Sequence, residues 1–144
     1  MPAIHIELKT GSAARPLVDG FYEKHGSQSR ARDPDLFFLA MSGQNLIGCV
    51  RYCTENATPL LRSMMIAENH RRKGIGARLL QAFCEFLDQN DIHNVFCLPY
   101  GHLGEFYTRM GFIQTAPEST PLFLAERLRD YSTSGKSYLC MRRS

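Results

Sequence analysis

The part of this sequence best suited to chemistry is a short basic segment that runs into two glycines. Residues 71–77 read RRKGIGA, and apolar residues at helical spacing begin inside this segment and continue to residue 87. The first turn of a helix has N–H groups without internal partners and carries partial positive charge. Glycines there let a phosphate group approach the backbone, and the cations add formal charge. The segment predicts a pyrophosphate site on backbone amides, close to Gly74 and Gly76 and to the cations Arg71, Arg72 and Lys73.

Two common nucleotide-binding motifs do not fit this segment. The stretch between strand and helix is too short for a P-loop, and it contains no G-x-G-x-x-G pattern. A nucleotide bound here would therefore be neither a P-loop triphosphate nor a Rossmann-bound dinucleotide. Further along, residues 106–112 read FYTRMGF and place Tyr107 on a short helical segment that stops at Gly111.

Hydrophobic spacing predicts the elements that must position these residues. Apolar runs bounded by turn residues indicate strands over 4–8, 35–41, 45–53 and 60–66, and the last three form an antiparallel meander. Gly48 indicates a bulge in the third strand. Helical spacing then predicts a long helix over 75–87. The remaining elements are a helix over 12–24, a strand over 93–98, helices over 103–110 and 121–130, and strands from 112 and over 137–141.

The strand–helix–strand unit over residues 60–98 requires a parallel pair inside an otherwise antiparallel sheet. The sequence therefore predicts a mixed α/β (α+β) fold with about seven strands and flanking helices. The chain has 144 residues, of which 44% are apolar and 22% charged, which is the size and composition of one globular domain. We expect that domain to span residues 1–144.

Charge, hydropathy and cysteine usage exclude several classes of protein. A net charge of +3 is low for a nucleic-acid-binding surface and suits a small anionic ligand. No apolar run reaches the ~20 residues of a membrane span, and the N-terminus has no leader-like pattern. The five cysteines contain no CxxC pair, and the five histidines show no H-x-x-x-H spacing. We therefore expect free thiols, a cytoplasmic location and no metal site.

The glycine-containing segment over residues 71–76 and the segment over residues 106–112 resemble, in their order and spacing, two motifs of the GNAT family of acyl-CoA N-acyltransferases. Residues 71–76 are similar to that family's [Gln/Arg]-x-x-Gly-x-[Gly/Ala] motif, and residues 106–112 are similar to its Phe-Tyr-x-x-x-Gly-Phe motif. The resemblance covers nearly the whole chain and is firmest over residues 35–112. It implies a GNAT-type mixed sheet whose fourth and fifth strands splay apart, with acetyl-CoA as the cosubstrate that enters the wedge.

The resemblance also implies roles for particular residues. The amides of Arg71, Arg72, Lys73, Gly74, Ile75, Gly76 and Ala77 would hold the pyrophosphate. The main chain of Met64 and Ile66, with Met65 between them, would bind the pantetheine arm along the edge that the splay leaves unpaired. Tyr107 would lie near the thioester sulfur as general acid and protonate the departing thiolate. The acceptor amine would attack the thioester directly, so one proton must leave the ammonium group and another must reach the sulfur.

Two positions depart from the family pattern. Tyr100 stands where many members have an asparagine that contacts the pantetheine. Many members also carry a basic carboxylate on the fourth strand, and residues 59–66 contain none. Glu55, at the end of the third strand, is the first choice for the general base, ahead of Glu68, His102 or an ordered water.

A narrower resemblance concerns the acceptor. Residues 60–66, LLRSMMI, are similar to a strand of the amino-acid N-acetyltransferases, a group that includes N-acetylglutamate synthase domains and arsenical-resistance acetyltransferases. Residues 121–128 are similar to the Pro-x-x-Leu segment of the same group. This resemblance implies that Arg62 binds a carboxylate of the acceptor. The expected activity is acetyl transfer to the primary amine of a small molecule, with an amino acid or an analogue favoured.

Several alternatives stay open at this point. Arg62 could pair with Glu55 or another acid across the strands, and Tyr107 could be a core tyrosine. The chain could be a protein or peptide N-acetyltransferase, or a non-catalytic acyl-CoA-binding module. The sequence also leaves open whether the chain forms a homodimer.

Overall fold

Seven strands form one open sheet, in the order β1-β2-β3-β4-β5-β7-β6, in the computed structural model, which describes residues 3–144. Met1 and Pro2, part of the segment inspected for a leader, lie outside the described residues. Strands β1 to β4 pair antiparallel, β4 pairs with β5 in parallel, and β7 pairs antiparallel with both β5 and β6. The mixed sheet and its parallel pair are therefore as predicted.

Four α-helices flank this sheet. The strands are β1 (Ile4–Thr10), β2 (Leu36–Ser42), β3 (Asn45–Glu55), β4 (Thr58–Ile66), β5 (Val95–Cys97), β6 (Phe112–Gln114) and β7 (Met141–Arg143). The α-helices are α1 (Gly11–Lys24), α2 (Ile75–Gln89), α3 (Gly104–Thr108) and α4 (Leu122–Ser132). None of the helices within residues 3–144 has both the length and the apolar character that crossing a bilayer would require.

The predicted last strand over 137–141 is wrong in position, because the β7 ladder begins only at Met141. The segment before it meets the chain that follows β5, where Leu139 N–H donates to Pro99 O at 2.9 Å and Tyr138 forms an isolated bridge with Tyr100. Pro99 has no N–H to offer, so a regular ladder cannot extend through it. The predicted helix over 103–110 is also shorter, since a 3-10 turn precedes α3.

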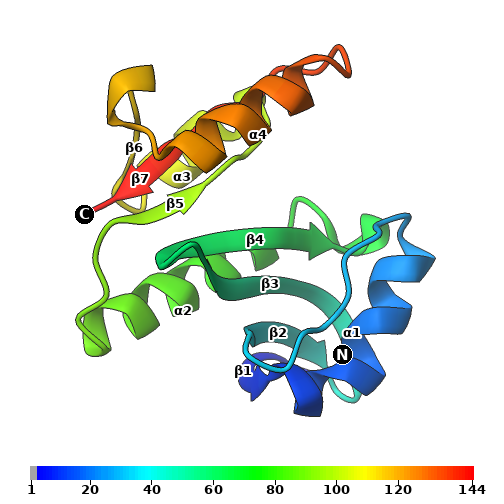
Figure 1. The fold of residues 1–144 in the computed structure, drawn as a ribbon. Helices are drawn as coiled ribbons and strands as arrows, with labels where there is room; N and C mark the ends of the chain where they lie inside the picture. Colours follow the sequence, from blue (N-terminus) through cyan, green and yellow to red (C-terminus); the bar gives the residue numbers. More distant parts are fainter. Residues whose placement is uncertain (1–2) are drawn as a thin grey trace.

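Helices cover both faces of the sheet (Figure 1). Side chains of β2 alternate between the two sides: Phe37 and Leu39 pack in a cluster with α1, whereas Phe38 and Ala40 pack with α2. Helix α4 lies on the α1 side, where Leu124 joins a third cluster. Helix α1 begins one residue earlier than predicted, because Thr10 Oγ1 accepts a hydrogen bond from Ala13 N–H and caps it.

A bulge at Ser63 bends β4. Arg51 of β3 faces Arg62, whereas Cys49 faces Met65, so β4 has one extra residue between these pairs. Ser63 takes a left-handed φ of 57°, and its carbonyl accepts a hydrogen bond of 2.8 Å from the hydroxyl of Tyr22. Bulges of this kind redirect a strand and increase its twist.

Strands β4 and β5 separate beyond their first contact. Their register contains the single pair Leu60↔Phe96 among the described residues, and Figure 1 shows the two strands diverging from there. The predicted splay is therefore present. The predicted bulge near Gly48 is present as well, because β2 pairs Ala40 with Gly48 and Met41 with Leu46.

We expect Tyr22→Phe to lower the free energy of unfolding by about 1–2 kcal/mol, because a half-buried carbonyl loses its donor at a residue with a left-handed φ. Tyr22 is 1% exposed. Urea unfolding measures the change. Tyr52→Phe, on the opposite face of the sheet, is the matched control and should cost less. Equal stability of Tyr22→Phe and the parent protein would show that the hydroxyl does not support the bulge.

Candidate active site

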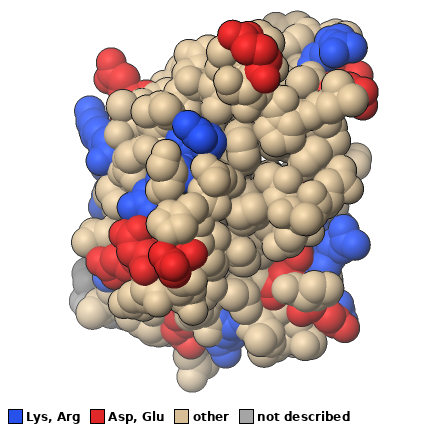
Figure 2. Space-filling view, turned by 60° about the vertical axis from the view of Figure 1, so that its left-hand side comes forward, with Lys and Arg blue, Asp and Glu red and all other residues tan. Residues whose placement is uncertain are grey.

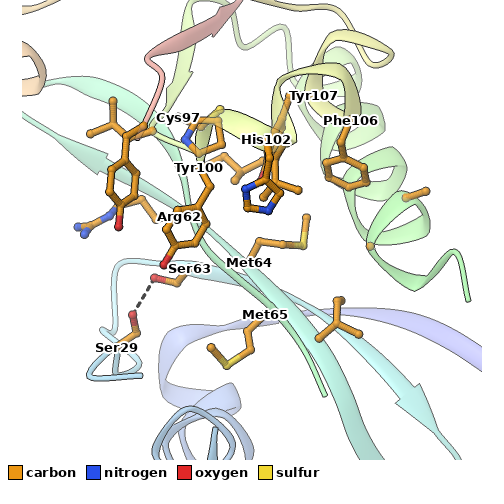
Figure 3. Close-up of a pocket in the computed structure, with 18 of the residues that line it drawn as sticks. Ser29, Arg62, Ser63, Met64, Met65, Cys97, Tyr100, His102, Phe106 and Tyr107 are labelled. Atoms are coloured by element: carbon orange, nitrogen blue, oxygen red, sulfur yellow. Dashed lines mark hydrogen bonds between the residues drawn. The ribbon is translucent and has the colours of Figure 1, made fainter. Parts of the chain in front are cut away.

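A cleft of about 950 Å³ opens where β4 and β5 diverge. Residues of β4, the start of α2, the segment through α3, and α4 form its walls. Figure 3 shows Tyr107, His102 and Met64 at its middle, with Phe106 on the side of α2 and Arg62 toward the other end. Both halves of the sheet therefore contribute to one cavity.

Most of the residues singled out in the sequence line this cleft. They are Arg62, Met64, Met65, Ile66, Arg71, Arg72, Gly74, Ile75, Gly76, Ala77 and Tyr107. Two are not part of the lining: Lys73 is exposed, and Glu55 lies behind Arg62, to which it is bonded. Of the other residues considered for the base, His102 lines the cleft and Glu68 does not.

The loop before α2 turns sharply through two left-handed residues, Arg72 at φ 64° and Gly74 at φ 77°. The N–H of Arg71 is engaged in a 3-10 turn, where it donates to Glu68 O at 3.3 Å. Inside the helix, Arg78 N–H donates to Gly74 O at 3.1 Å. Between these two points, the N–H groups of residues 74–77 belong to the start of the helix, where no intrahelical acceptors exist, and those of residues 72 and 73 belong to the loop before it. Of the predicted amides at residues 71–77, that of Arg71 thus already has an acceptor, and those of residues 72–77 stay a prediction.

Gly76 keeps a passage open between α2, α3 and β4. A Cβ atom placed there would lie 3.5 Å from Cζ of Phe106 and 3.9 Å from Cγ1 of Ile66. These are ordinary contact distances, so a methyl group would just fill the gap. Any longer side chain would have to enter the cleft or displace its walls.

The end of β4 is open toward the cleft and tied to the basic loop. Because β4 pairs with β5 only at Leu60 among the described residues, its main chain from 62 to 66 lacks a strand partner on that side. Arg71 Nε donates to the carbonyl of Ile66 at 3.1 Å. A carbonyl oxygen has two lone pairs, so this contact leaves room for a second donor.

Tyr107 lies deep in the cleft and is 4% exposed. Its ring packs edge-on against Phe106 and Phe112, with centroids 5.0 and 5.6 Å apart. Burial, with a smaller effect of Cys97, raises the pKa of the Tyr107 hydroxyl above its usual value. The hydroxyl is therefore protonated at neutral pH and can donate a proton to a leaving group.

Glu55 is held between two arginines. Arg62 Nη1 donates to its Oε2 at 2.9 Å, and Arg127 Nη2 donates to its Oε1 at 2.7 Å. Burial acts to raise the pKa of the Glu55 carboxyl, but the hydrogen bonds and charges of Arg127 and Arg62 outweigh burial and lower the pKa. A carboxylate in this state accepts a proton weakly at neutral pH. The geometry therefore favours Glu55 as an anchor for the two arginines over Glu55 as a base.

Sequence reasoning missed a group of residues that the structure adds to this cleft. They are Ser29, Arg127, Tyr131 and Tyr138. On α4, the spacing of Leu124, Arg127 and Tyr131 is typical of one helix face and is visible in the sequence. That this face meets the cleft depends on how α4 packs, so the spacing alone could not reveal it.

The cleft carries a strong bias in charge. Four arginines line it, Arg62, Arg71, Arg72 and Arg127, and no Asp or Glu of the described chain does. Elsewhere the two signs lie close together, as Figure 2 shows for one face of the molecule. No group of three or more His, Cys, Asp or Glu side chains within residues 3–144 is arranged to hold a metal ion. All five cysteines are buried and free, which confirms the expectation of unpaired thiols.

Comparison with known proteins identifies the fold. A family model described as an acetyltransferase (GNAT) domain matches residues 33–114. No curated protein sequence matches the chain.

Among solved structures, N-acetylglutamate synthase from Neisseria gonorrhoeae, complexed with coenzyme A and N-acetyl-glutamate, has a TM-score of 0.66 at 19% identity. The match covers 99% of this chain but 35% of the synthase, so the chain spans about a third of that relative. ElaA from Escherichia coli gives 0.69 at 15% identity, over 99% of this chain and 100% of that one. A GNAT-family acetyltransferase from Staphylococcus aureus Mu50 gives 0.64 at 16% identity, over 98% of each chain. At these identities the likeness concerns the fold.

Proposed function

This chain belongs to the GNAT acetyltransferase family, and from that premise we propose that it acetylates the primary amine of a small molecule, either an amino acid or an analogue. Acyl-CoA-dependent acetyl transfer follows from membership of the family. The identity of the acceptor and the roles of individual residues are proposed here. We also propose that residues 1–144 act as one domain. The buried free thiols support a reducing compartment such as the cytoplasm.

One observation carries the proposal: a single cleft joins an open helix start, a buried protonated tyrosine and an arginine pair. At one end, the amides of residues 72–77 would hold the pyrophosphate of acetyl-CoA, and Arg71, Arg72 and the nearby Lys73 would add positive charge. Along the middle, the free edge of β4 from Met64 to Ile66 would bind the pantetheine arm. The glycine at position 76 leaves the space that this arm needs.

The reaction needs two proton movements and no covalent enzyme intermediate. The neutral amine attacks the thioester carbonyl carbon, a C–N bond forms, and the C–S bond breaks. Tyr107 gives its proton to the departing thiolate and regains one from solvent. Glu55 is hydrogen-bonded to Arg62 and Arg127 and is a weak proton acceptor. We therefore propose that the proton lost by the acceptor's ammonium group goes to water or to His102, which lines the cleft.

A thiol-release screen tests this function. Purified protein is mixed with acetyl-CoA and a panel of amino acids, polyamines and peptides, and free CoA is measured with a thiol reagent. We expect release with at least one amino acid, above the rate without acceptor, and an acetylated product by mass spectrometry. Release with peptides alone would indicate a protein N-acetyltransferase. No release with any amine, with acetyl-CoA binding detected by calorimetry, would indicate a non-catalytic module.

We expect Arg62→Ala to raise the KM for an amino acid acceptor about tenfold or more, because a charge-assisted hydrogen bond to the acceptor carboxylate is lost. The KM for acetyl-CoA should stay the same, since Arg62 lies at the end of the cleft away from residues 72–77. Steady-state kinetics with each substrate varied measures both. Arg15→Ala is the control, because Arg15 pairs with Asp33 at the surface. An unchanged acceptor KM would rule out this role for Arg62.

A further inference from the structure

Helix α4 presents one face to the cleft, and this face carries a cation and an aromatic ring. Leu124, Arg127 and Tyr131 all line the cleft at intervals of three and four residues. Leu124 is buried with Leu60 and Phe96 and fixes the helix against the sheet. Arg127 and Tyr131 lie one turn apart, which is about 6 Å along the helix. A molecule in the cleft can therefore contact both side chains at once.

The cation on this face is one half of an arginine pair. Arg62 and Arg127 share the carboxylate of Glu55, so the three groups together keep one positive charge. The side chains of Arg62 and Arg127 are 33% and 26% exposed, and each guanidinium has five N–H donors. The hydrogen bonds to Glu55 use only part of these donors. Two planar forks with spare donors and net positive charge are suited to a carboxylate.

The aromatic side of the cleft is a row of rings. The centroids of Tyr131 and Tyr138 are 4.9 Å apart, those of Tyr138 and Tyr100 are 4.8 Å apart, and Tyr100 stacks on His102 at 5.7 Å. All four residues line the cleft, and Tyr100 is 39% exposed. Figure 3 shows Tyr100 and His102 between Arg62 and Tyr107. The row therefore runs from the arginine pair toward the predicted general acid.

We propose that the acceptor is an α-amino acid with an aromatic side chain. Its carboxylate is held by Arg62 and Arg127, and its ring stacks on the row of Tyr131, Tyr138 and Tyr100. The proposal rests on the proposed function and specifies the acceptor of the same site. The C–N bond forms at the α-amino group and the C–S bond breaks. One proton leaves the ammonium group for water or His102, and one passes from Tyr107 to the thiolate.

Two other acceptor classes fit this cleft less well. A polyamine would meet four arginines and no acidic side chain among the described lining residues. A dicarboxylic amino acid would need a second cation beside the ring row. Lys136 lies over Tyr100 at 5.6 Å from the ring centroid, but it does not line the cleft. An aromatic side chain can pack against the solvent-accessible parts of these rings and needs no further charge.

Four matched acceptors test the proposal by thiol release: L-phenylalanine, L-alanine without the ring, phenethylamine without the carboxylate, and L-glutamate with a second charge. We expect kcat/KM for phenylalanine to exceed each of the others by at least about tenfold. Arg127→Gln should remove the preference over phenethylamine. Tyr131→Leu should remove the preference over alanine and keep the preference over phenethylamine. Neither variant should change the KM for acetyl-CoA.

Controls separate the possible failures. Arg129→Gln removes an exposed charge from the same helix and should leave both preferences intact, and Arg127→Lys tests whether charge without the planar fork suffices. If alanine, phenethylamine or glutamate reacts as well as phenylalanine, the aromatic acceptor is wrong and the acetyltransferase function stands. If none of the four releases CoA while another amine does, the proposal is again wrong. If no amine releases CoA, the proposed function fails with it.

Discussion

Gly76→Leu is expected to weaken the binding of acetyl-CoA about a hundredfold or more, close to 3 kcal/mol. At this position a methyl group already reaches contact distance from Phe106 and Ile66. The additional carbons of leucine would therefore project into the passage between the helix start and β4. That passage is where the proposed pyrophosphate and pantetheine sites meet, so the side chain would exclude the ligand. Isothermal calorimetry with CoA and acetyl-CoA measures the loss.

Two further glycine variants make this result interpretable. Gly20→Leu introduces the same side chain on α1, where an added Cβ meets no atom within 4 Å, and it should leave CoA affinity unchanged. Gly76→Ala adds only the methyl that fits, and its affinity should fall between those of the parent and Gly76→Leu. If Gly76→Leu is folded and binds CoA as the parent does, the nucleotide does not pass this glycine.

Tyr107→Phe is expected to lower kcat by about 10²–10³, which is within the usual contribution of a general acid. The variant keeps the ring that packs against Phe106 and Phe112 and removes only the hydroxyl. The affinity for CoA and the free energy of unfolding should therefore change little. Stopped-flow or steady-state thiol release measures the chemical step, and Tyr52→Phe provides a tyrosine control on a residue outside the cleft. An unchanged kcat would leave Tyr107 as a core residue.

The pH dependence of the same reaction follows from the direction of the pKa shift. Burial raises the pKa of Tyr107, so its hydroxyl stays protonated up to a higher pH than an exposed tyrosine would. Loss of the catalytic acid should therefore not limit the rate below the ordinary range of tyrosine near pH 10. The acceptor ammonium must lose its proton, so kcat/KM for the acceptor should rise with pH and then level. Tyr107→Phe should show the same rise at a lower rate.

The sequence points to the residues of the proposed CoA end of the cleft more completely than to those of the proposed acceptor end. Residues 71–77 and 106–112 are contiguous motifs, and their neighbours in the chain are also their neighbours in space. The proposed acceptor end includes Ser29 from a loop, Arg62 from β4, and Arg127 and Tyr131 from α4. Spacing along the chain contains no information on which of these meet. Their proximity depends on the packing of α4 against Leu60 and Phe96.

Glu55 is a second case in which position along the chain does not reveal the partners of a side chain. From its position at the end of a strand, Glu55 is expected to be a carboxylate without a partner, and it is the first choice for the general base. Its two partners are 7 and 72 positions away along the chain, and the second of them is brought close only by tertiary folding. A charged residue's chemistry depends on its partners, so residue type and local position were not enough to settle what this carboxylate does.

The gap beyond the Leu60↔Phe96 pair also has a thermodynamic meaning. A sheet that stops pairing near the start of a strand leaves main-chain dipoles facing water. Amide hydrogens on that margin can exchange with solvent without any unfolding of the rest. An extended molecule with its own amide groups, lying along the margin, continues the ladder as another strand would. Such a molecule would then share in the hydrogen bonding of the sheet, and its binding should slow amide exchange along this margin.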